Sequence, residues 1–436
     1  PETSEPENAE PGTAEQDAET RRVIVLVNGK EEQMGTATTS TIDNRTVMTI
    51  AVDSAKLNQK LTEEGYGAVV TIPVPSGAVV AVGDLNGQMV KNMEDQEAVL
   101  EIRTDRATYT IPALQINIGA ISEQLGAEAA LEDIKVQVKI GEPAEETIRL
   151  AENAESDGAF TIVVPPVEFM IQATYGETTV EVTRFDVYVE RTIAIPKDVD
   201  PNKITTGVVV EPDGTMRHVP TKIIVVDGKY YAVINSLTNS TYAVVWNPRE
   251  FADAAEHWAK DTVKNMGSRM IIEGTGNGRF SPDRDITRAE FTAMIVRALG
   301  LGLGKGKSIF QDVKNTDWFS GAIRTAYEYS LIGGYDDGTF RPNDRITREQ
   351  AMIIISKAMA LTGLKTKLSG DSADAALHKF ADANQASGWA IEAIADCLQA
   401  GIVSGRSENQ LAPKDLITRA EAAAMIERLL QKSDLI

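Results

Sequence analysis

A five-residue stretch that occurs three times in the second half constrains this chain more than any other feature. Residues 286–290 read ITRAE, residues 346–350 read ITREQ and residues 417–421 read ITRAE. In each copy a tryptophan precedes the arginine by the same interval, with a glycine between them at one shared offset. These positions are Trp258, Gly274 and Arg288; Trp318, Gly334 and Arg348; and Trp389, Gly405 and Arg419. Recurrence at fixed spacing predicts three copies of one supersecondary unit.

A second anchor precedes each tryptophan. It reads Phe-x-Asp and ends at Asp253, Asp312 and Asp382. Its distance to the tryptophan grows by one residue in each successive copy, so we expect a loop there. The remainder of each copy is predicted to be rigid.

Each copy is predicted to fold as helix, loop, helix. We expect Gly334 to be the left-handed residue that ends the first helix of its copy. The loop that follows has Gly, Phe and Pro at shared offsets in two copies, whereas the third copy has Asn409, Leu411 and Pro413. Asparagine is the usual substitute for glycine at positive φ, so we expect the loop geometry to persist.

The second helix of each copy is predicted to begin at the threonine of the ITR motif. Thr287 with Glu290 forms the pattern of a capping box, which Thr418 with Glu421 repeats and Thr347 with Gln350 varies. Apolar residues then follow at helical spacing: Phe291, Met294, Ile295, Ala298 and Leu299 in the first copy, and Ala422, Met425, Ile426, Leu429 and Leu430 in the third. Three such helices can pack together as one core.

Together these motifs resemble the S-layer homology (SLH) module, usually found in threes on Gram-positive surface proteins. The resemblance covers the chain from about Phe251 onward. It implies a pseudo-threefold assembly, located extracellularly at the cell wall, that binds a pyruvylated secondary cell wall polysaccharide in grooves between repeats. It also implies that the recurring Asp, Trp, Gly and Arg contact the polymer. Those residues are Asp253, Trp258, Gly274, Arg288, Asp312, Trp318, Gly334, Arg348, Asp382, Trp389, Gly405 and Arg419.

Structural explanations compete with these binding roles. Capping alone accounts for the threonines and for the Glu or Gln. The arginines lie in a first helical turn, where the helix dipole disfavours a cation by roughly 0.3–1 kcal/mol; they either bind carboxylates or form local ion pairs with acids such as Asp285 or Asp344. The tryptophans either anchor the first helix to the core or stack on a sugar, and the aspartates either cap that helix or accept hydrogen bonds from sugar hydroxyls. The third copy lacks the Gly-x-Phe loop residues, which weakens the case for its ligand contacts.

The first half of the chain reads as strands. Residues 1–20 are Pro- and Glu-rich without large apolar side chains, which predicts a disordered acidic linker. Two β-rich modules are expected at 21–140 and 141–249, with short helices near residues 54–61 and 118–125; one large β domain with an insertion is the alternative. The polar run 141–158 is expected to be a boundary or a long loop, and Asp227-Gly228 predicts a hairpin turn.

The sequence therefore predicts β-sandwich-like modules followed by an all-α SLH assembly with a three-helix core. We expect the first repeat at 250–307, the second with a linker at 308–379 and the third at 380–436. The chain starts at a proline, without a signal peptide, as expected for a mature or excised segment of an exported protein.

Composition limits the functions available. A formal charge of −21 argues against nonspecific binding to nucleic acid or to an anionic membrane, and no apolar run approaches the roughly 18 residues of a membrane span. The single cysteine, Cys397, is expected to be buried. No catalytic, cofactor or metal-binding pattern stands out around the three histidines. We therefore expect a nonenzymatic wall anchor; the alternatives are a subunit of the S-layer lattice, with other surface-layer subunits as partners, or the anchoring portion of an exported polysaccharide-processing enzyme.

Overall fold

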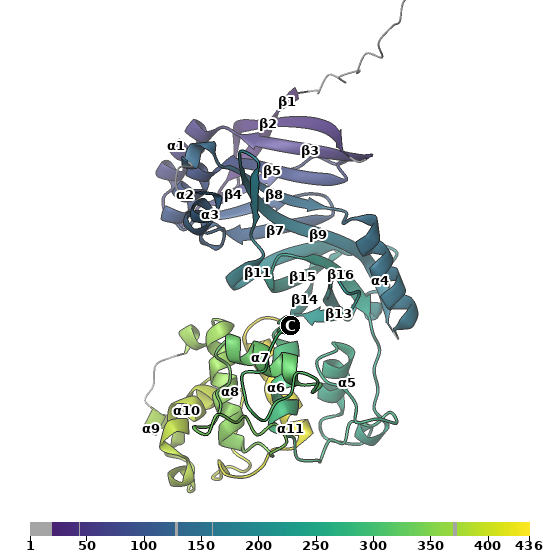
Figure 1. The fold of residues 1–436 in the computed structure, drawn as a ribbon, viewed down its shortest axis with the longest axis vertical. Coiled ribbons are helices and arrows are strands. Elements are labelled where there is room, and N and C mark those ends of the chain that lie inside the picture. Colours follow the sequence, from purple (N-terminus) through teal and green to yellow (C-terminus); the bar gives the residue numbers. More distant parts are fainter. Residues whose placement is uncertain (1–19, 43, 127–129, 159, 369–372) are drawn as a thin grey trace, which may run out of the picture.

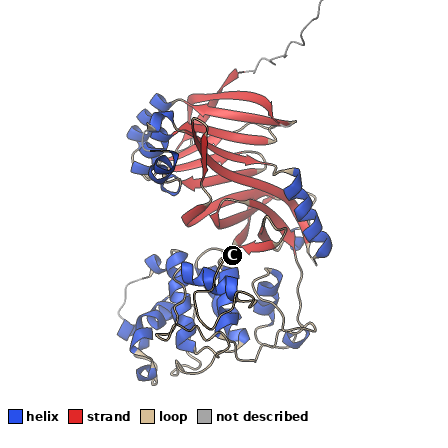
Figure 2. Cartoon of the chain, viewed as in Figure 1, coloured by secondary structure: helices blue, strands red, loops and turns tan. Residues whose placement is uncertain are grey.

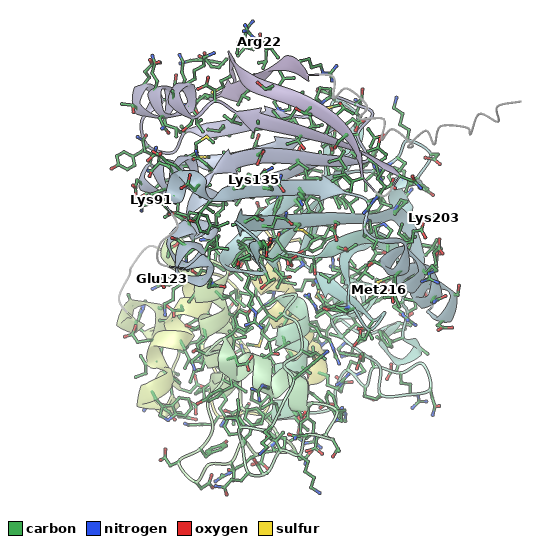
Figure 3. All side chains as sticks on the ribbon, turned by 45° about the horizontal axis from the view of Figure 1, so that its top comes forward. Arg22, Lys91, Glu123, Lys135, Lys203 and Met216 are labelled. Atoms are coloured by element: carbon green, nitrogen blue, oxygen red, sulfur yellow. The ribbon has the colours of Figure 1, made fainter. Side chains whose placement is uncertain are left out.

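The computed structural model describes residues 20–436 except 43, 127–129, 159 and 369–372. The predicted acidic linker lies outside the described residues but for its last residue, Thr20. A β-rich region comes first and a helical region follows, as predicted (Figures 1 and 2). Figure 3 shows their side chains, with Lys135 on the sheet and Met216 near the boundary with the helical region.

The strands of the β-rich region extend from Thr20 to Trp246. They are β1 (Thr20–Val27), β2 (Lys30–Ile42), β3 (Arg45–Val52), β4 (Val69–Pro73), β5 (Val80–Asn86), β6 (Val99–Arg103), β7 (Ala107–Pro112), β8 (Lys135–Gly141), β9 (Thr161–Tyr175), β10 (Thr178–Glu181), β11 (Arg184–Ala194), β12 (Thr206–Val210), β13 (Met216–Val219), β14 (Thr221–Val226), β15 (Lys229–Thr238) and β16 (Thr241–Trp246).

All of these strands belong to one mixed sheet. Its order is β13-β12-β16-β9-β8-β5-β3-β2-β1-β4-β6-β7-β11-β15-β14, with β10 paired to β9. The β3–β5 and β4–β6 pairs are parallel and the others antiparallel. Both end strands, β13 and β14, adjoin Pro220 in the chain. Asp227 and Gly228 have φ of 50° and 73°, as the predicted two-residue hairpin turn requires.

Among the described residues, four α-helices accompany the sheet: α1 (Ser54–Glu64), α2 (Gly87–Asp95), α3 (Ile118–Leu125) and α4 (Glu145–Asp157). The first three gather at one side and α4 lies at the other (Figure 1). The predicted helices near 54–61 and 118–125 are confirmed as α1 and α3. The predicted long loop at 141–158 is wrong, because α4 forms there and buries Ala151. Because α4 buries a single residue, its sequence lacks the recurring apolar positions by which a helix is predicted.

One cluster of buried side chains joins the two predicted β modules. It includes Val25 of β1, Leu100 of β6, Ile140 of β8 and Val244 of β16. The predicted boundary after residue 140 falls inside β8, which pairs with β9 along its length. The modules thus share a sheet and a core, while the domain bounds themselves stay a prediction.

The helical region is built from pairs of helices. They are α5 (Lys260–Ser268) and α6 (Arg288–Ala298); α7 (Ser320–Glu328) and α8 (Arg348–Leu361); and α10 (Ile391–Gln399) and α11 (Arg419–Lys432), with the short α9 (Ala373–Leu377) before the last pair. The second helix of each repeat packs on the first helix of the next: α6 on α7, α8 on α10 and α11 on α5. The predicted apolar stripes are buried, and so is Cys397. Burial raises the pKa of the Cys397 thiol. The repeats therefore close into a ring.

Direct contacts fix the helical region against the sheet. The Tyr188 hydroxyl on β11 donates to the Leu299 carbonyl over 2.8 Å, and Arg217 on β13 donates to the carbonyl of Gly300. Arg269 donates to the carbonyl of Thr221 over 2.9 Å. These contacts join the helical region directly to strands β11, β13 and β14 of the sheet.

Candidate functional site

The capping boxes place the three arginines at equivalent positions. In each of α6, α8 and α11 the threonine side chain accepts from the third backbone N–H, and the Glu or Gln side chain accepts from the threonine N–H. Arg288, Arg348 and Arg419 are then the first helical residues. The predicted helix starts are confirmed.

Each arginine crosses from its own repeat into the loop of the next. Arg288 Nε donates to the Phe340 carbonyl over 3.0 Å, Arg348 Nε to that of Leu411 over 3.0 Å, and Arg419 Nε to that of Phe280 over 2.8 Å. These three residues are 9%, 6% and 5% exposed, and this burial lowers the pKa of all three guanidinium groups. Neither Asp285 nor Asp344 forms an ion pair with them in the described structure.

The aspartates of the Phe-x-Asp anchor hold the same loops. Asp253 accepts from the backbone N–H groups of Phe280 and Ser281, both over 2.8 Å. Asp312 and Asp382 bind their own loops in the same way. Partial burial raises the pKa of Asp253, but these two hydrogen bonds outweigh it, and the pKa lies below its ordinary value. The carboxylates therefore hold the loop in shape. The sequence had predicted helix capping or sugar binding for them, and not this role.

The recurring glycine leaves room for the phenylalanine ring of the Phe-x-Asp motif in its own repeat. A Cβ on Gly334 would lie 2.4 Å from Phe310 Cε1, and one on Gly405 would lie 2.6 Å from Phe380 Cε1. The prediction that Gly334 is the left-handed end of a helix is wrong. That conformation belongs to Ser330, with φ of 57°, just after α7. Asn409 does not have the positive φ expected of it either. In its loop the N–H groups of Arg406 and Ser407 both donate to the Gln410 carbonyl.

The three tryptophans are exposed. Trp258, Trp318 and Trp389 have 65%, 61% and 60% of their surface accessible. The residue after each tryptophan is buried instead, namely Ala259, Phe319 and Ala390. These neighbours anchor the first helix, so the indole rings are free to contact a ligand.

One groove combines several of these residues from all three repeats. It has a volume of about 470 Å³ and is lined by Trp258 of the first repeat, Arg348 of the second and Gly405 of the third. Three cations and two acids contribute to its charge: Arg348, Arg406, Arg428, Asp283 and Glu421. It offers an indole face, a buried guanidinium and a net positive charge on a chain that is acidic overall.

Two cations in this groove were not predicted from the sequence. Arg428 lies nine residues after Arg419, and the equivalent positions hold Arg297 and Lys357, so a recurring basic residue was an available signal. Arg406 has no basic counterpart in the other repeats. Among the described residues, no group of three or more His, Cys, Asp or Glu is arranged to hold a metal ion, and none of the described helices is long and apolar enough to span a membrane.

Comparison with known proteins identifies the repeats. The family model described as S-layer homology domain matches residues 250–292, 309–352 and 379–423. A surface layer protein of Brevibacillus choshinensis is 32% identical over 170 residues, covering 36% of this chain and 15% of the relative. An exoglucanase XynX of Acetivibrio thermocellus is 39% identical over 199 residues, covering 45% of this chain and 18% of the relative.

A third relative extends the similarity beyond the repeats. The amylopullulanase of Thermoanaerobacterium thermosulfurigenes is 37% identical over 246 residues, covering 56% of this chain and 13% of the relative. Because residues 250–436 make up less than half of the chain, the alignment includes part of the β-rich region. The chain spans less than a fifth of the length of each of these three relatives. Relatives at the cell surface indicate anchoring there, and residues 250–423 of this chain carry three S-layer homology domains.

Proposed function

We propose that this chain is a noncatalytic anchor that holds a surface protein on the bacterial cell wall by binding a pyruvylated secondary cell wall polysaccharide. The observation that carries the proposal is the groove that is lined by both the exposed Trp258 and the buried Arg348. A pyruvate ketal adds a carboxylate to a sugar ring, so the ligand has one apolar face and one anionic group. The groove offers a partner for each.

The guanidinium of Arg348 is positioned to receive the carboxylate. Its Nε and Nη2 donate to the carbonyls of Leu411 and Ser404, which fix its orientation, while Nη1 stays 4.0 Å from Glu421. Because the guanidinium is already desolvated and oriented, binding an anion there costs little additional ordering. Arg406 and Arg428 add positive charge to the same groove.

A calorimetric titration of the whole chain with purified polymer tests the proposal. We expect binding to native polymer, none to polymer stripped of pyruvate, and a loss of at least about tenfold in affinity for Arg348→Ala. Arg103→Ala is the control, since Arg103 is exposed on the sheet and, among the described residues, its side chain pairs with Glu101 alone. Equal binding of stripped polymer, or no binding by the folded wild type, overturns the proposal.

The names of two relatives favour a second candidate. An amylopullulanase and an exoglucanase each match this chain over only a small share of their own length. The chain would then be the anchoring portion of a longer polysaccharide-processing protein. Activity of the protein, as isolated from its native cell surface, on starch or on β-glucan supports this candidate, and inactivity on both argues against it.

A further inference from the structure

The three equivalent arginines differ in the carboxylate that faces them. Arg419 Nη1 donates to Glu290 Oε1 over 2.9 Å, whereas Arg348 Nη1 lies 4.0 Å from Glu421. Arg288 forms no ion pair with any described acid. We call a guanidinium closed when an internal carboxylate binds it and open when none does. Arg419 is therefore closed, Arg348 is partly open and Arg288 is open.

The capping residue of the next helix explains why Arg288 has no carboxylate partner. Glu290 and Glu421 both occupy the third helical position, where their carboxylates also accept from the threonine N–H. The second repeat has Gln350 at this position, which makes the same capping bond without a charge. Arg288 is the arginine that faces the second repeat, so it is the one without a carboxylate partner.

Arg288 is nevertheless held firmly in place. Its guanidinium carbon lies 4.7 Å from the ring centre of Phe340 and 5.0 Å from that of Tyr335, and Nε donates to the Phe340 carbonyl. No described residue accepts a hydrogen bond from Nη1 or Nη2 of Arg288, although the residue is only 9% exposed. Two parallel N–H donors on a fixed, desolvated guanidinium match the two oxygens of a carboxylate.

The repeat equivalence supplies further cations near this position. Lys357 takes the place that Arg428 has in the described groove, and Lys414 takes that of Asp283. The Lys414 ammonium lies 5.8 Å from the ring centre of Trp389, the tryptophan equivalent to Trp258. Lys414 also pairs with Glu349 over 2.6 Å, whereas Lys357 forms no ion pair with any acid in the described part of the chain.

We propose that the third residue of each capped helix, together with the ion pairs it already makes, determines which arginine accepts a ligand carboxylate. Gln350 leaves Arg288 open as a second carboxylate-binding position, and Glu290 closes Arg419. Glu421 pairs with Arg406 over 3.1 Å and stays 4.0 Å from Arg348, so it leaves Arg348 available. This inference rests on the proposed function. The side chain of Glu290 already occupies the guanidinium fork as an internal anion, and it would repel an incoming carboxylate. Arg284, which also binds Glu290, holds the internal anion in place.

Reciprocal substitutions at the capping position test the inference. Gln350→Glu and Glu290→Gln each introduce the residue that the chain already uses in another repeat, so both capping boxes are retained. The probe is a short pyruvylated oligosaccharide, titrated calorimetrically into the whole chain. We expect two binding equivalents for the wild type, one for Gln350→Glu and three for Glu290→Gln, with Arg288→Ala matching Gln350→Glu.

The outcomes separate this inference from the proposed function. Binding that depends on pyruvate and on Arg348, yet has the same stoichiometry in both capping variants, overturns the inference and leaves the proposed function standing. No binding by the wild type, or binding that ignores pyruvate, overturns both. Circular dichroism of each variant confirms that the capped helices are intact.

Discussion

The backbone N–H of Ile286 donates to the carbonyl of Ile417 over 3.0 Å, which joins the first repeat to the third. Ile346 donates to Ile286 over 3.2 Å, and Ile417 donates to Ile346 over 3.3 Å, so the three bonds form a closed circle. Because each helix pair also packs on the next repeat, no repeat has a complete core of its own. The circle makes the three repeats one structural unit.

Hydrogen exchange should therefore report one cooperative opening of the ring. We expect the core amides of α6, α8 and α11 to exchange with the same free energy under native conditions, because opening one repeat removes neighbours of both others. Mass spectrometry of fragments resolves the three helices. Earlier exchange of α11 alone, at the end of the chain, would show that the third repeat opens independently.

Adding one methyl group at Gly334 should destabilise the helical region. A Cβ there would lie 2.4 Å from Phe310 and 2.9 Å from the Thr339 carbonyl, so Gly334→Ala should lower the free energy of unfolding by about 1–3 kcal/mol. The neighbouring Gly333 is the control, since a Cβ on it meets nothing within 4 Å. Chemical denaturation compares the two. Equal stability of both variants contradicts the tight approach at Gly334.

The Asp382 clamp predicts a dependence of stability on pH. Partial burial raises the pKa of Asp382, but the N–H groups of Leu411 and Ala412 outweigh this and hold the pKa below its ordinary 3.8. The clamp thus stabilises the fold above pH 3.8, and the effect is lost as pH falls through the lower folded value. Asp382→Asn should cost about 1–3 kcal/mol at neutral pH and progressively less below pH 3.8.

Denaturant titrations at several pH values measure this difference. Asp186→Asn is the control, because Asp186 is exposed and has no ion pair among the described residues. A cost for Asp382→Asn that stays constant down to pH 2 would show that the carboxylate charge is not what holds the loop.

Local chemistry decided how much of this structure the sequence revealed. The start of α6 is specified by hydrogen bonds between Thr287 and Glu290, which are three residues apart. The turn between β14 and β15 is specified by Asp227-Gly228. Both features were predictable because the residues involved are close in sequence. The crossing of Arg288 to Phe340 was not, because it joins residues from different repeats that only the closed ring brings together.

The same reason explains the errors. Gly334 was interpreted through the helix before it, whereas its actual constraint is the ring of Phe310, which lies earlier in the chain and packs against it. The exposure of Trp258 likewise depends on Ala259 filling the core position beside it. The order of the sixteen strands rests on pairings such as β7 with β11, which alternation along one strand cannot specify.

Arg191 is expected to be essential for the stability of the β-rich region. It is fully buried, lies 4.9 Å from the ring centre of Tyr109 and 5.0 Å from that of Tyr242, and donates to the carbonyls of Val189 and Thr238. A lysine lacks the planar fork that serves both carbonyls and stacks on the rings, so Arg191→Lys should cost at least about 2 kcal/mol.

Chemical denaturation of Arg191→Lys and of Arg184→Lys measures the effect. Arg184 lies on the same strand but is exposed, which makes it the matched control. Equal stability of the two variants would mean that the buried guanidinium is replaceable by any cation.

Trp258 should separate binding from stability. Because 65% of its surface is exposed and Ala259 fills the core beside it, Trp258→Ala should change the free energy of unfolding by less than about 0.5 kcal/mol. Loss of an aromatic face against a sugar should reduce affinity for the pyruvylated polymer by about tenfold, which corresponds to roughly 1.4 kcal/mol. Tyr66→Ala is the control, since Tyr66 is an aromatic residue 80% exposed on the β-rich region.

Calorimetric binding and denaturation are measured on both variants. A large loss of stability for Trp258→Ala would show that the indole has a structural role. Unchanged affinity for the polymer would show that Trp258 does not contact the ligand.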